Sequence, residues 1–432
     1  MGPWASAVGW QARERFALPV SVNYHRSVNQ TLFEKLLRDH LLPMIPGATL
    51  TGPGVLAGKW KQKAAALTAP CSISVRPEKA ATYDFTLGRS QKFRTDEVKL
   101  VEAFVEAVDE IKDAIGKPFE SEVLHGLPLR VVARAAGGTA SAGLLRVLEQ
   151  FAAWAAEQYE GRPIVAAVGI DPSASGTVDI GLVWKESFAP VLSNGLDTLL
   201  IVDGASRVAD LLAAPVSSSA APSFSPYRYR SLAEWAAGGR IAVSLNRNGE
   251  ILVFLGGCLR FALRAGGWQH FTHEAALSAI HLPHKKAVKT ALYETLLDVS
   301  FARTGGCLAV VDNGNSSQLV GTVAPSDYLA PSPPASPSTK GQLLATAVGA
   351  DFTKLDRRVR AELLALDGAT IIDHLGNLIA VGAIVQIQAG STGGGRLAAA
   401  KTLASLGLGV KISQDGGVIG FDSSGQALFE FG

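Results

Sequence analysis

The last third of the chain contains the stretch that decides its fold, a glycine-rich run ending in arginine: Ala389-Gly390-Ser391-Thr392-Gly393-Gly394-Gly395-Arg396. The apolar segment Leu378 to Ile387 precedes this run, and Leu397 to Ala404, a segment of strong helix propensity, follows it. The sequence therefore predicts a strand, then a glycine loop, then the N-terminus of a helix.

A loop of this kind is suited to binding phosphate. Backbone N–H groups at the start of a helix carry partial positive charge, and glycines let a phosphate come close to them. Arg396 would add a guanidinium group, while the hydroxyls of Ser391 and Thr392 can donate to phosphate or cap the helix. The loop matches neither GxGxxG nor GxxxxGK[ST], so taken alone it is more typical of a structural turn.

A single carboxylate lies upstream of the loop, in Leu366-Asp367-Gly368-Ala369, with Ile371 and Ile372 after it. An Asp-Gly pair is common in ordinary turns, so Asp367 can be explained without any function. A carboxylate at the edge of a strand and a glycine-rich loop ending in arginine are together parts of a nucleotide-phosphate site. Both interpretations remain open from these residues alone.

The order of these motifs resembles the diadenylate cyclase (DAC) domain over roughly residues 285 to 432. The resemblance rests on five segments in sequence order: Leu292 to Leu297, Thr304 to Asp312, Asp367 to Ala369, the glycine-rich run and Val410 to Ile419. In particular the chain is similar to a group of bacterial proteins called DACNV, in which a sensor region precedes the DAC domain.

This resemblance implies roles for individual residues. In the family an Asp-Gly-Ala motif supplies a carboxylate for the metal and for the attacking ribose hydroxyl. That role would fall to Asp367, Gly368 and Ala369, with Asp367 binding a divalent metal, Mg²⁺ or Mn²⁺. A nucleotide-binding set would include the loop residues and the first residue of a third family segment, Ser-Glu-Glu-Thr-Gly in the family and Ser413-Gln414-Asp415-Gly416-Gly417 here: Ser391, Thr392, Gly393, Gly394, Gly395, Arg396 and Ser413.

The chain departs from the family in its second motif. An Arg-His-Arg motif holds the ATP phosphates in the family, and here Arg396 takes the place of the last arginine while Gly394 and Gly395 replace the other two residues. Two hypotheses follow. The chain is a nucleotidyltransferase that condenses two ATP into cyclic di-AMP, which requires a homo-oligomer with facing domains, or it is a catalytically degenerate nucleotide-binding sensor module. A weaker third possibility makes the DAC-like part a scaffold for a partner-binding N-terminal region.

Composition sets broad limits on function. The 432 residues are 47% hydrophobic and carry a formal charge of only +2, which gives no electrostatic footprint for nucleic acid or a membrane surface. No apolar run is long enough to cross a bilayer and the first residues do not resemble a signal peptide, so we expect a cytoplasmic protein without nucleic-acid or membrane partners. The three cysteines lack CxxC spacing, which predicts reduced thiols.

The rest of the pattern predicts an α/β protein in which a mixed sheet flanked by helices, the DAC-like part, follows a separate α/β sensor-like region. We expect the sensor-like region over 1–212, a Ser-, Ala- and Pro-rich linker over 213–228 and the nucleotide domain over 229–432. Helical spacing predicts helices from Thr95 and from Ala142, and Asn248-Gly249 predicts a hairpin. Strands are expected at Pro163 to Gly169, Thr177 to Trp184 and Thr198 to Val202. Two HxxH pairs, His270 with His273 and His281 with His284, are weak evidence for zinc, because such sites need well-placed cysteine or carboxylate partners and Pro283 interrupts the second pair.

Overall fold

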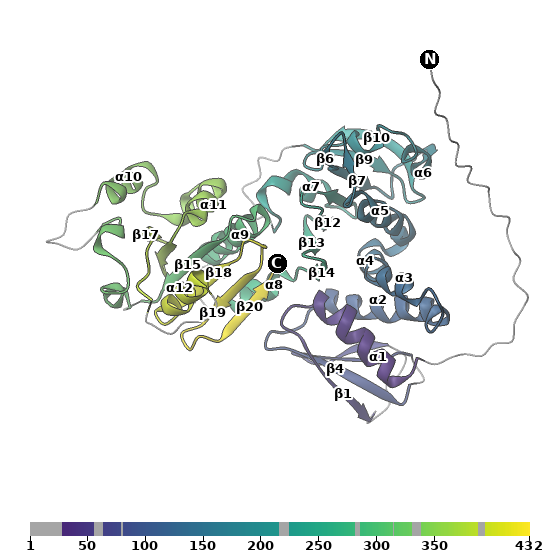
Figure 1. Ribbon diagram of the computed structural model, residues 1–432, viewed down its shortest axis with the longest axis horizontal. Coiled ribbons are helices and arrows are strands. Elements are labelled where there is room, and N and C mark those ends of the chain that lie inside the picture. The colour runs from purple at the N-terminus through teal and green to yellow at the C-terminus, as the bar shows by residue number, and fades with distance from the viewer. Residues whose placement is uncertain are drawn as a thin grey trace, which may run out of the picture.

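A computed structural model describes eight parts of the chain: residues 28–55, 64–78, 81–215, 224–280, 286–313, 315–330, 338–387 and 394–432. They form a mixed α/β fold whose mixed sheets are flanked by helices, in two sheet-bearing regions, which confirms the predicted fold class. The two regions lie at opposite ends of the long axis, and the last strand, β20 (Ala427–Phe431), lies on the side of the C-terminal region that faces the N-terminal region (Figure 1).

The N-terminal region begins with a four-stranded antiparallel sheet in the order β1-β4-β3-β2. Its strands are β1 (Thr49–Val55), β2 (Ala65–Ala69), β3 (Ser72–Val75) and β4 (Tyr83–Gly88). Helices α1 (Gln30–Leu36) and α2 (Thr95–Ile111) pack on it, because the ring of Phe33 lies 6.1 Å from Phe85 and 6.4 Å from Phe104. The predicted helix from Thr95 is confirmed.

An eight-stranded sheet follows in the order β14-β13-β12-β11-β7-β9-β10-β8. Its strands are β7 (Ala166–Ile170), β8 (Val178–Asp179), β9 (Thr198–Val202), β10 (Arg207–Ala213), β11 (Ile241–Leu245), β12 (Ile251–Leu255), β13 (Cys258–Arg264) and β14 (Gly267–His270). Alternate residues enter two different cores: Val243 faces the core that contains α5 (Ser141–Trp154), whereas Ala242 faces the core that contains α7 (Arg230–Trp235). The predicted hairpin at Asn248-Gly249 joins β11 to β12.

Two expectations differ from the structure. Strands β11 to β14 follow the predicted linker over 213–228 yet extend the same sheet as β7, so the N-terminal sheet continues past the expected boundary. The expected strand Thr177 to Trp184 contains only β8 and then turns into the short helix α6 (Ile180–Val183). The carboxylate of Asp179 accepts a hydrogen bond from the Gly181 N–H at 2.8 Å, which starts the helical turn.

The C-terminal region contains a six-stranded mixed sheet in the order β17-β16-β15-β18-β19-β20. Strands β15 (Gly306–Val311) and β16 (Ala369–Asp373) are parallel, and the other neighbours are antiparallel: β17 (Leu378–Ala383), β18 (Gly407–Ile412), β19 (Val418–Phe421) and β20. Helix α12 (Gly395–Ala404) covers one face through Ala400 and Leu403, and α9 (Lys286–Ala302) and α11 (Arg357–Ala365) cover the other.

Helix α9 joins the two regions. Its Leu292 and Leu296 enter one core that contains Phe254 of β12 and Val410 of β18, so one apolar cluster spans the eight-stranded and the six-stranded sheet. Helix α4 (Leu127–Gly137) packs between α2 and α5 in the N-terminal core. The remaining elements are α3 (Glu120–His125), α8 (His273–Ala279), α10 (Thr339–Ala347) and the hairpin β5 (Gln158–Tyr159) with β6 (Arg162–Pro163).

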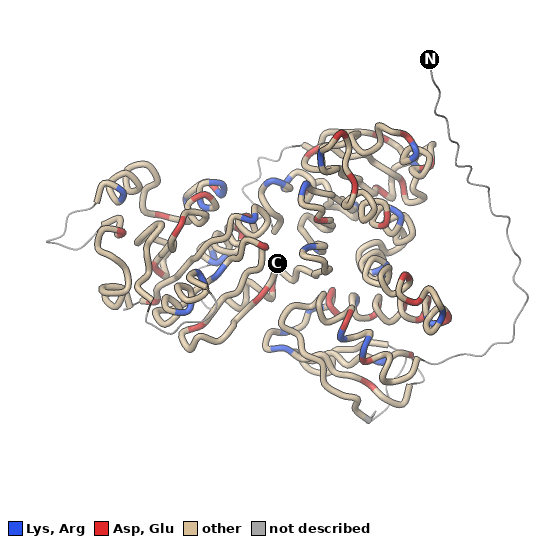
Figure 2. The backbone as a smooth tube through the Cα atoms, viewed as in Figure 1, with Lys and Arg blue, Asp and Glu red and all other residues tan. Residues whose placement is uncertain are grey.

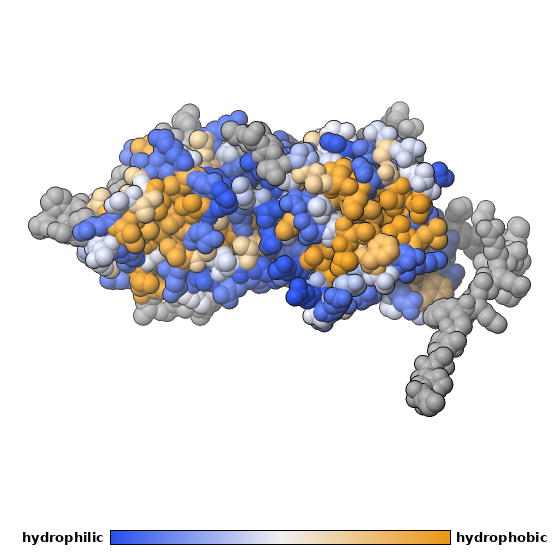
Figure 3. All heavy atoms as spheres, turned by 90° about the horizontal axis from the view of Figure 1, so that it is seen from above, coloured by the Kyte–Doolittle hydropathy of each residue, from blue (hydrophilic) through white to orange (hydrophobic). Residues whose placement is uncertain are grey.

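The surface is mixed in charge and in hydropathy. Acidic and basic residues are both scattered along the described parts of the two regions (Figure 2). Seen from above, apolar side chains gather over both ends of the molecule, with a hydrophilic band between them (Figure 3). No helix in the described ranges is long and apolar enough to cross a membrane.

Candidate functional site

The predicted site residues that the structure describes line a single pocket of about 560 Å³ at one end of the six-stranded sheet. Asp367, Gly368 and Ala369 form one side of it, and Gly394, Gly395, Arg396 and Ser413 are further lining residues. The sequence order of strand β17, loop and helix α12 is confirmed at its two ends. The predicted contacts of Ser391, Thr392 and Gly393 lie outside the described residues.

The floor of the pocket is a row of residues on three neighbouring strands. Ala369 of β16 lies opposite Cys307 of β15, and Cys307 lies opposite Lys411 of β18. Residues paired in this way have their side chains on the same face of a sheet. All three line the pocket, which places the cationic side chain of Lys411 on the same face as the Asp-Gly-Ala motif, two strands away from Ala369.

The Asp367 turn joins the end of α11 to the start of β16. The Asp367 side chain is exposed, and its Oδ1 accepts a hydrogen bond from the Gly368 N–H at 3.1 Å. Gly368 has φ of +98°, and a Cβ there would lie 2.6 Å from the carbonyl carbon of Gly382. Only glycine fits this close approach of two backbone segments without strain. The glycine of the motif is therefore explained by structure as well as by the predicted function.

Helix α12 begins at the rim of the pocket. Gly394 precedes it with φ of +88°, and among the described residues no side chain caps its first turn. The first residues of the helix line the pocket, and the free N–H groups of a helix N-terminus favour an anion there. The Arg396 guanidinium lies over Gly305, which is in the turn between α9 and β15. A Cβ added at Gly305 would lie 2.5 Å from Arg396 Nη1.

The charges of the lining favour an anionic ligand. Arg396 and Lys411 are cationic, and Asp367 is the one carboxylate among the described lining residues. Lys411 was not predicted as a site residue. The signal that could have found it is its charge in the otherwise apolar segment Leu408 to Ile412, whose neighbours Val410 and Ile412 are buried.

Apolar residues form the remaining wall. Ile384 and Ile387 follow β17 and are 61% and 39% exposed, which is high for isoleucine side chains. An apolar wall beside a cationic one suits a ligand with a flat, apolar part and a phosphate part. The rim also offers an apolar surface to a second molecule.

The thiol of Cys307 belongs to the pocket floor but is only 1% exposed. Burial raises the pKa of Cys307 to about 12, and the nearby Arg396 opposes this rise only in part. The thiol is therefore protonated near neutral pH and is a poor nucleophile. Cys71, Cys258 and Cys307 are all free in the structure.

A divalent metal fits this pocket only with help from the ligand. No group of three or more His, Cys, Asp or Glu side chains that could hold a metal occurs in the described part of the chain. Asp367 alone would supply a carboxylate, and one carboxylate plus substrate phosphates is a common way for proteins to bind Mg²⁺. The residues present therefore fit a metal carried by a nucleotide better than a resident metal.

The histidine pairs do not form a metal site in the described residues. His273 is buried; its Nε2 donates to the Leu259 carbonyl at 2.6 Å and its Nδ1 accepts from the Tyr293 hydroxyl at 2.7 Å. Burial lowers the pKa values of both His270 and His273 to about 3, so both are neutral. These two are core histidines, while His281 and His284 lie outside the described residues.

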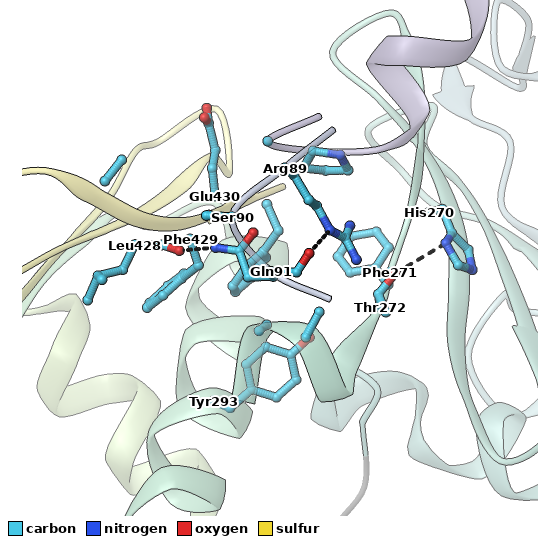
Figure 4. Close-up of a pocket in the computed structure, with 16 residues that line it drawn as sticks. Arg89, Ser90, Gln91, His270, Phe271, Thr272, Tyr293, Leu428, Phe429 and Glu430 are labelled. Carbon is cyan, nitrogen blue, oxygen red and sulfur yellow. Dashed lines mark hydrogen bonds between the residues drawn. The ribbon is translucent and has the colours of Figure 1, made fainter. Parts of the chain in front are cut away.

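A second pocket, of about 280 Å³, lies where the two regions meet (Figure 4). Gln91 of the N-terminal region points toward β20, and its side-chain amide donates to the Leu428 carbonyl. The Arg89 guanidinium is held by Glu97, 2.6 Å away, and by two backbone carbonyls. The positive charge of Arg89 is thus already neutralised by Glu97. The pocket is therefore better described as a contact between the two regions than as an ion-binding site.

Comparison with known proteins gives a distant structural likeness. A solved structure of DacA from Staphylococcus aureus, a diadenylate cyclase carrying two cysteine substitutions, is 14% identical to this chain. The match covers 34% of this chain and 88% of that one, with a TM-score of 0.22. A score of this size establishes neither a shared fold nor a shared function. No family model matches the chain, and no curated protein matches it.

Proposed function

We propose that the pocket of Asp367 and Arg396 binds ATP or a closely related nucleotide with a divalent cation, and that two facing chains condense two ATP into cyclic di-AMP. The observation that carries the proposal is the meeting of three features on one pocket: the Asp367 carboxylate, the N-terminus of α12 and the cations Arg396 and Lys411. Each feature recognises a different part of a metal–nucleotide complex.

In this proposal Arg396, Lys411 and the N–H groups of α12 hold the phosphates, and the apolar wall at Ile384 and Ile387 faces the base. A cation held between Asp367 and the phosphates would lower the pKa of the attacking ribose hydroxyl. The 3′-oxygen of one ATP forms a bond to the α-phosphorus of the other as pyrophosphate leaves. Repeating the step with the two nucleotides exchanged closes the ring.

A homo-oligomer follows from this chemistry. The resemblance supplies one nucleotide domain per chain, whereas the reaction needs two facing nucleotides, so a second chain must contribute the other. The exposed Ile384 and Ile387 lie on the rim of the pocket and would be covered in such a pair. Product formation should therefore rise faster than linearly with protein concentration in dilute solution, because mass action controls the pairing.

The test incubates the protein with ATP and either Mg²⁺ or Mn²⁺ and identifies products by mass spectrometry. Cyclic di-AMP from the wild type, and none from Asp367→Asn, would support the cyclase, because an amide binds a hard cation far more weakly than a carboxylate does. Turnover that survives Asp367→Asn would show that this aspartate has another role.

A second candidate function is a nucleotide-binding module without chemistry. The observation that favours it is the glycine pair Gly394 and Gly395, which leaves Arg396 as the one cation of its motif. ATP binding by calorimetry without any cyclic product, with either metal, would support this candidate. Absence of both binding and product would remove both functions.

A further inference from the structure

A buried arginine of the N-terminal region touches the turn that carries part of the nucleotide pocket. Arg264 is the last residue of β13, in the eight-stranded sheet, and its side chain is 1% exposed. Its Nη1 donates to the Ser300 hydroxyl at 2.9 Å and its Nη2 donates to the Ser300 carbonyl at 2.8 Å. Ser300 lies in α9, the helix shared by both regions.

The next contact leads from α9 into the six-stranded sheet. The Ser300 hydroxyl donates to the carbonyl of Gly416, in the turn between β18 and β19. Gly416 is buried with φ of +94°, and a Cβ there would lie 2.0 Å from Arg264 Nη2. The turn therefore rests directly on the Arg264 guanidinium, with no room for a side chain between them.

The same turn reaches the pocket through its first residues. Two backbone hydrogen bonds close it: the Gly416 N–H donates to the Ser413 carbonyl at 3.0 Å, and the Ser413 N–H donates to the Gly417 carbonyl at 2.8 Å. Ser413 and Gln414 line the pocket. Because five residues closed in this way move largely together, a displacement at Gly416 shifts the pocket lining at Ser413.

The charge of Arg264 is balanced on the N-terminal side. Its Nε donates to Glu250 Oε1 at 2.8 Å, and Arg303, near the end of α9, contacts the same oxygen at 2.6 Å. Glu250 directly precedes β12, so a shift of the β12–β13 hairpin moves both Glu250 and Arg264. Substitution of Arg264 would leave Glu250 paired with Arg303. The contact between Arg264 and Ser300 can therefore be tested by mutation without leaving a buried carboxylate unpaired.

We propose that Arg264 is a positioning residue through which the N-terminal sheet sets the conformation of the 413–417 turn and hence the nucleotide affinity of the pocket. The inference rests on the proposed nucleotide site and concerns its regulation. A ligand or partner that moves β13 would change affinity through this one contact chain: Arg264, Ser300, Gly416 and Ser413. The chain is continuous, buried and short, which suits it to carry a coupling free energy.

The experiment compares two arginines that share one carboxylate. Arg264→Lys keeps the charge near Glu250 but cannot reproduce the two hydrogen bonds to Ser300. Arg303→Lys is the matched control, because Arg303 contacts Glu250 and no residue of the turn. Ser300→Ala breaks the same chain from α9 and serves if Arg264→Lys fails to fold.

Two readouts separate positioning from stability. Hydrogen exchange followed by mass spectrometry measures the opening of residues 413–417 without any nucleotide, and calorimetry measures the affinity for ATP with Mg²⁺. We expect Arg264→Lys and Ser300→Ala to speed exchange in the turn about tenfold and to weaken ATP binding about tenfold, while Arg303→Lys changes neither. Variants are compared at temperatures equally far below their unfolding midpoints.

Each outcome decides a different claim. Exchange unchanged in folded Arg264→Lys and Ser300→Ala would overturn the inference outright. Faster exchange with unchanged ATP affinity would reduce Arg264 to a structural contact and overturn the coupling. A wild type that binds no ATP would refute the proposed function instead, and the exchange result would still decide whether Arg264 holds the turn.

Discussion

Two sets of cationic side chains lie on opposite faces of the six-stranded sheet, and they differ in how they are paired. On the α9 side, Arg357 contacts Asp298 at 2.6 Å and Arg360 contacts Glu294 at 3.0 Å, all with little exposure. On the α12 side, Arg396 and Lys411 have no ion pair within the described parts of the chain. The same chemical groups thus serve packing where acids surround them and remain available to a ligand where they do not.

The largest effect should come from breaking the paired set. Arg357→Ala leaves the carboxylate of Asp298 buried without its principal partner, so we expect a loss of about 3–5 kcal/mol in the free energy of unfolding. Burial already raises the pKa of Asp298 despite the guanidinium beside it, which shows how poorly solvated this carboxylate is. Urea denaturation of the wild type and the variant measures the difference.

The control for this prediction lies in the same helix. Arg358 pairs with Asp356 at 3.0 Å on the exposed side of α11. Arg358→Ala should change the urea midpoint little, because water solvates both partners. Equal losses for Arg357→Ala and Arg358→Ala would show that burial does not distinguish the two pairs.

The unpaired set should respond in the opposite way. Arg396→Ala should leave the urea midpoint near that of the wild type and weaken ATP binding by about 1–3 kcal/mol, the contribution of a charge-assisted hydrogen bond. Lys411→Ala should act in the same direction. Calorimetry with ATP and Mg²⁺ checks both variants; unchanged affinity with the fold intact would place the phosphates away from this pocket.

The sequence predicted the parts of the fold that depend on local pattern. The helix from Thr95, the Asn248-Gly249 turn, and the strand and the helix on either side of the glycine-rich run are all present. The fold class followed from the same patterns. Each of these signals lies within a window of about 20 residues, where periodicity and turn chemistry act.

The features that the sequence did not predict depend on contacts between distant segments. Residues 213–228 have the composition of a linker, but composition does not reveal that β11 pairs with β7 across them. Lys411 became a site residue only because strand register places it beside Cys307 and in one row with Ala369. The contact of Arg264 with Ser300 joins residues 36 positions apart, and nothing in either local sequence announces it.

A smaller loss of stability is expected when acid protonates His270 and His273, which lie at the junction between the two regions. The pKa values of His270 and His273 are lowered to about 3, so between pH 6.5 and 3 the unfolded chain binds more protons than the folded one. Stability must then fall as pH falls through this window, by about 1–2 kcal/mol per histidine from pH 7 to pH 5. Urea midpoints across this range measure it.

One variant sharpens this pH prediction. His273→Gln, whose side chain cannot take up a proton, should flatten the dependence of the urea midpoint on pH. A slope unchanged by His273→Gln would mean that this histidine becomes charged without cost in the folded protein.

The last prediction is that Cys307 does not react with an alkylating reagent in the native protein. It tests whether the floor of the pocket is packed as tightly as the hydrophobic core. With a pKa of about 12, the thiolate fraction at pH 7.5 is on the order of 10⁻⁴ or less, and the thiol is nearly inaccessible as well. Iodoacetamide should therefore label the partly exposed Cys71 and leave Cys307 unmodified, as peptide mass spectrometry can show. Labelling of both after urea treatment is the control for detection. If native Cys307 reacts as fast as Cys71, the sheet opens beneath the pocket, and the contrast between a packed face and an available face no longer holds.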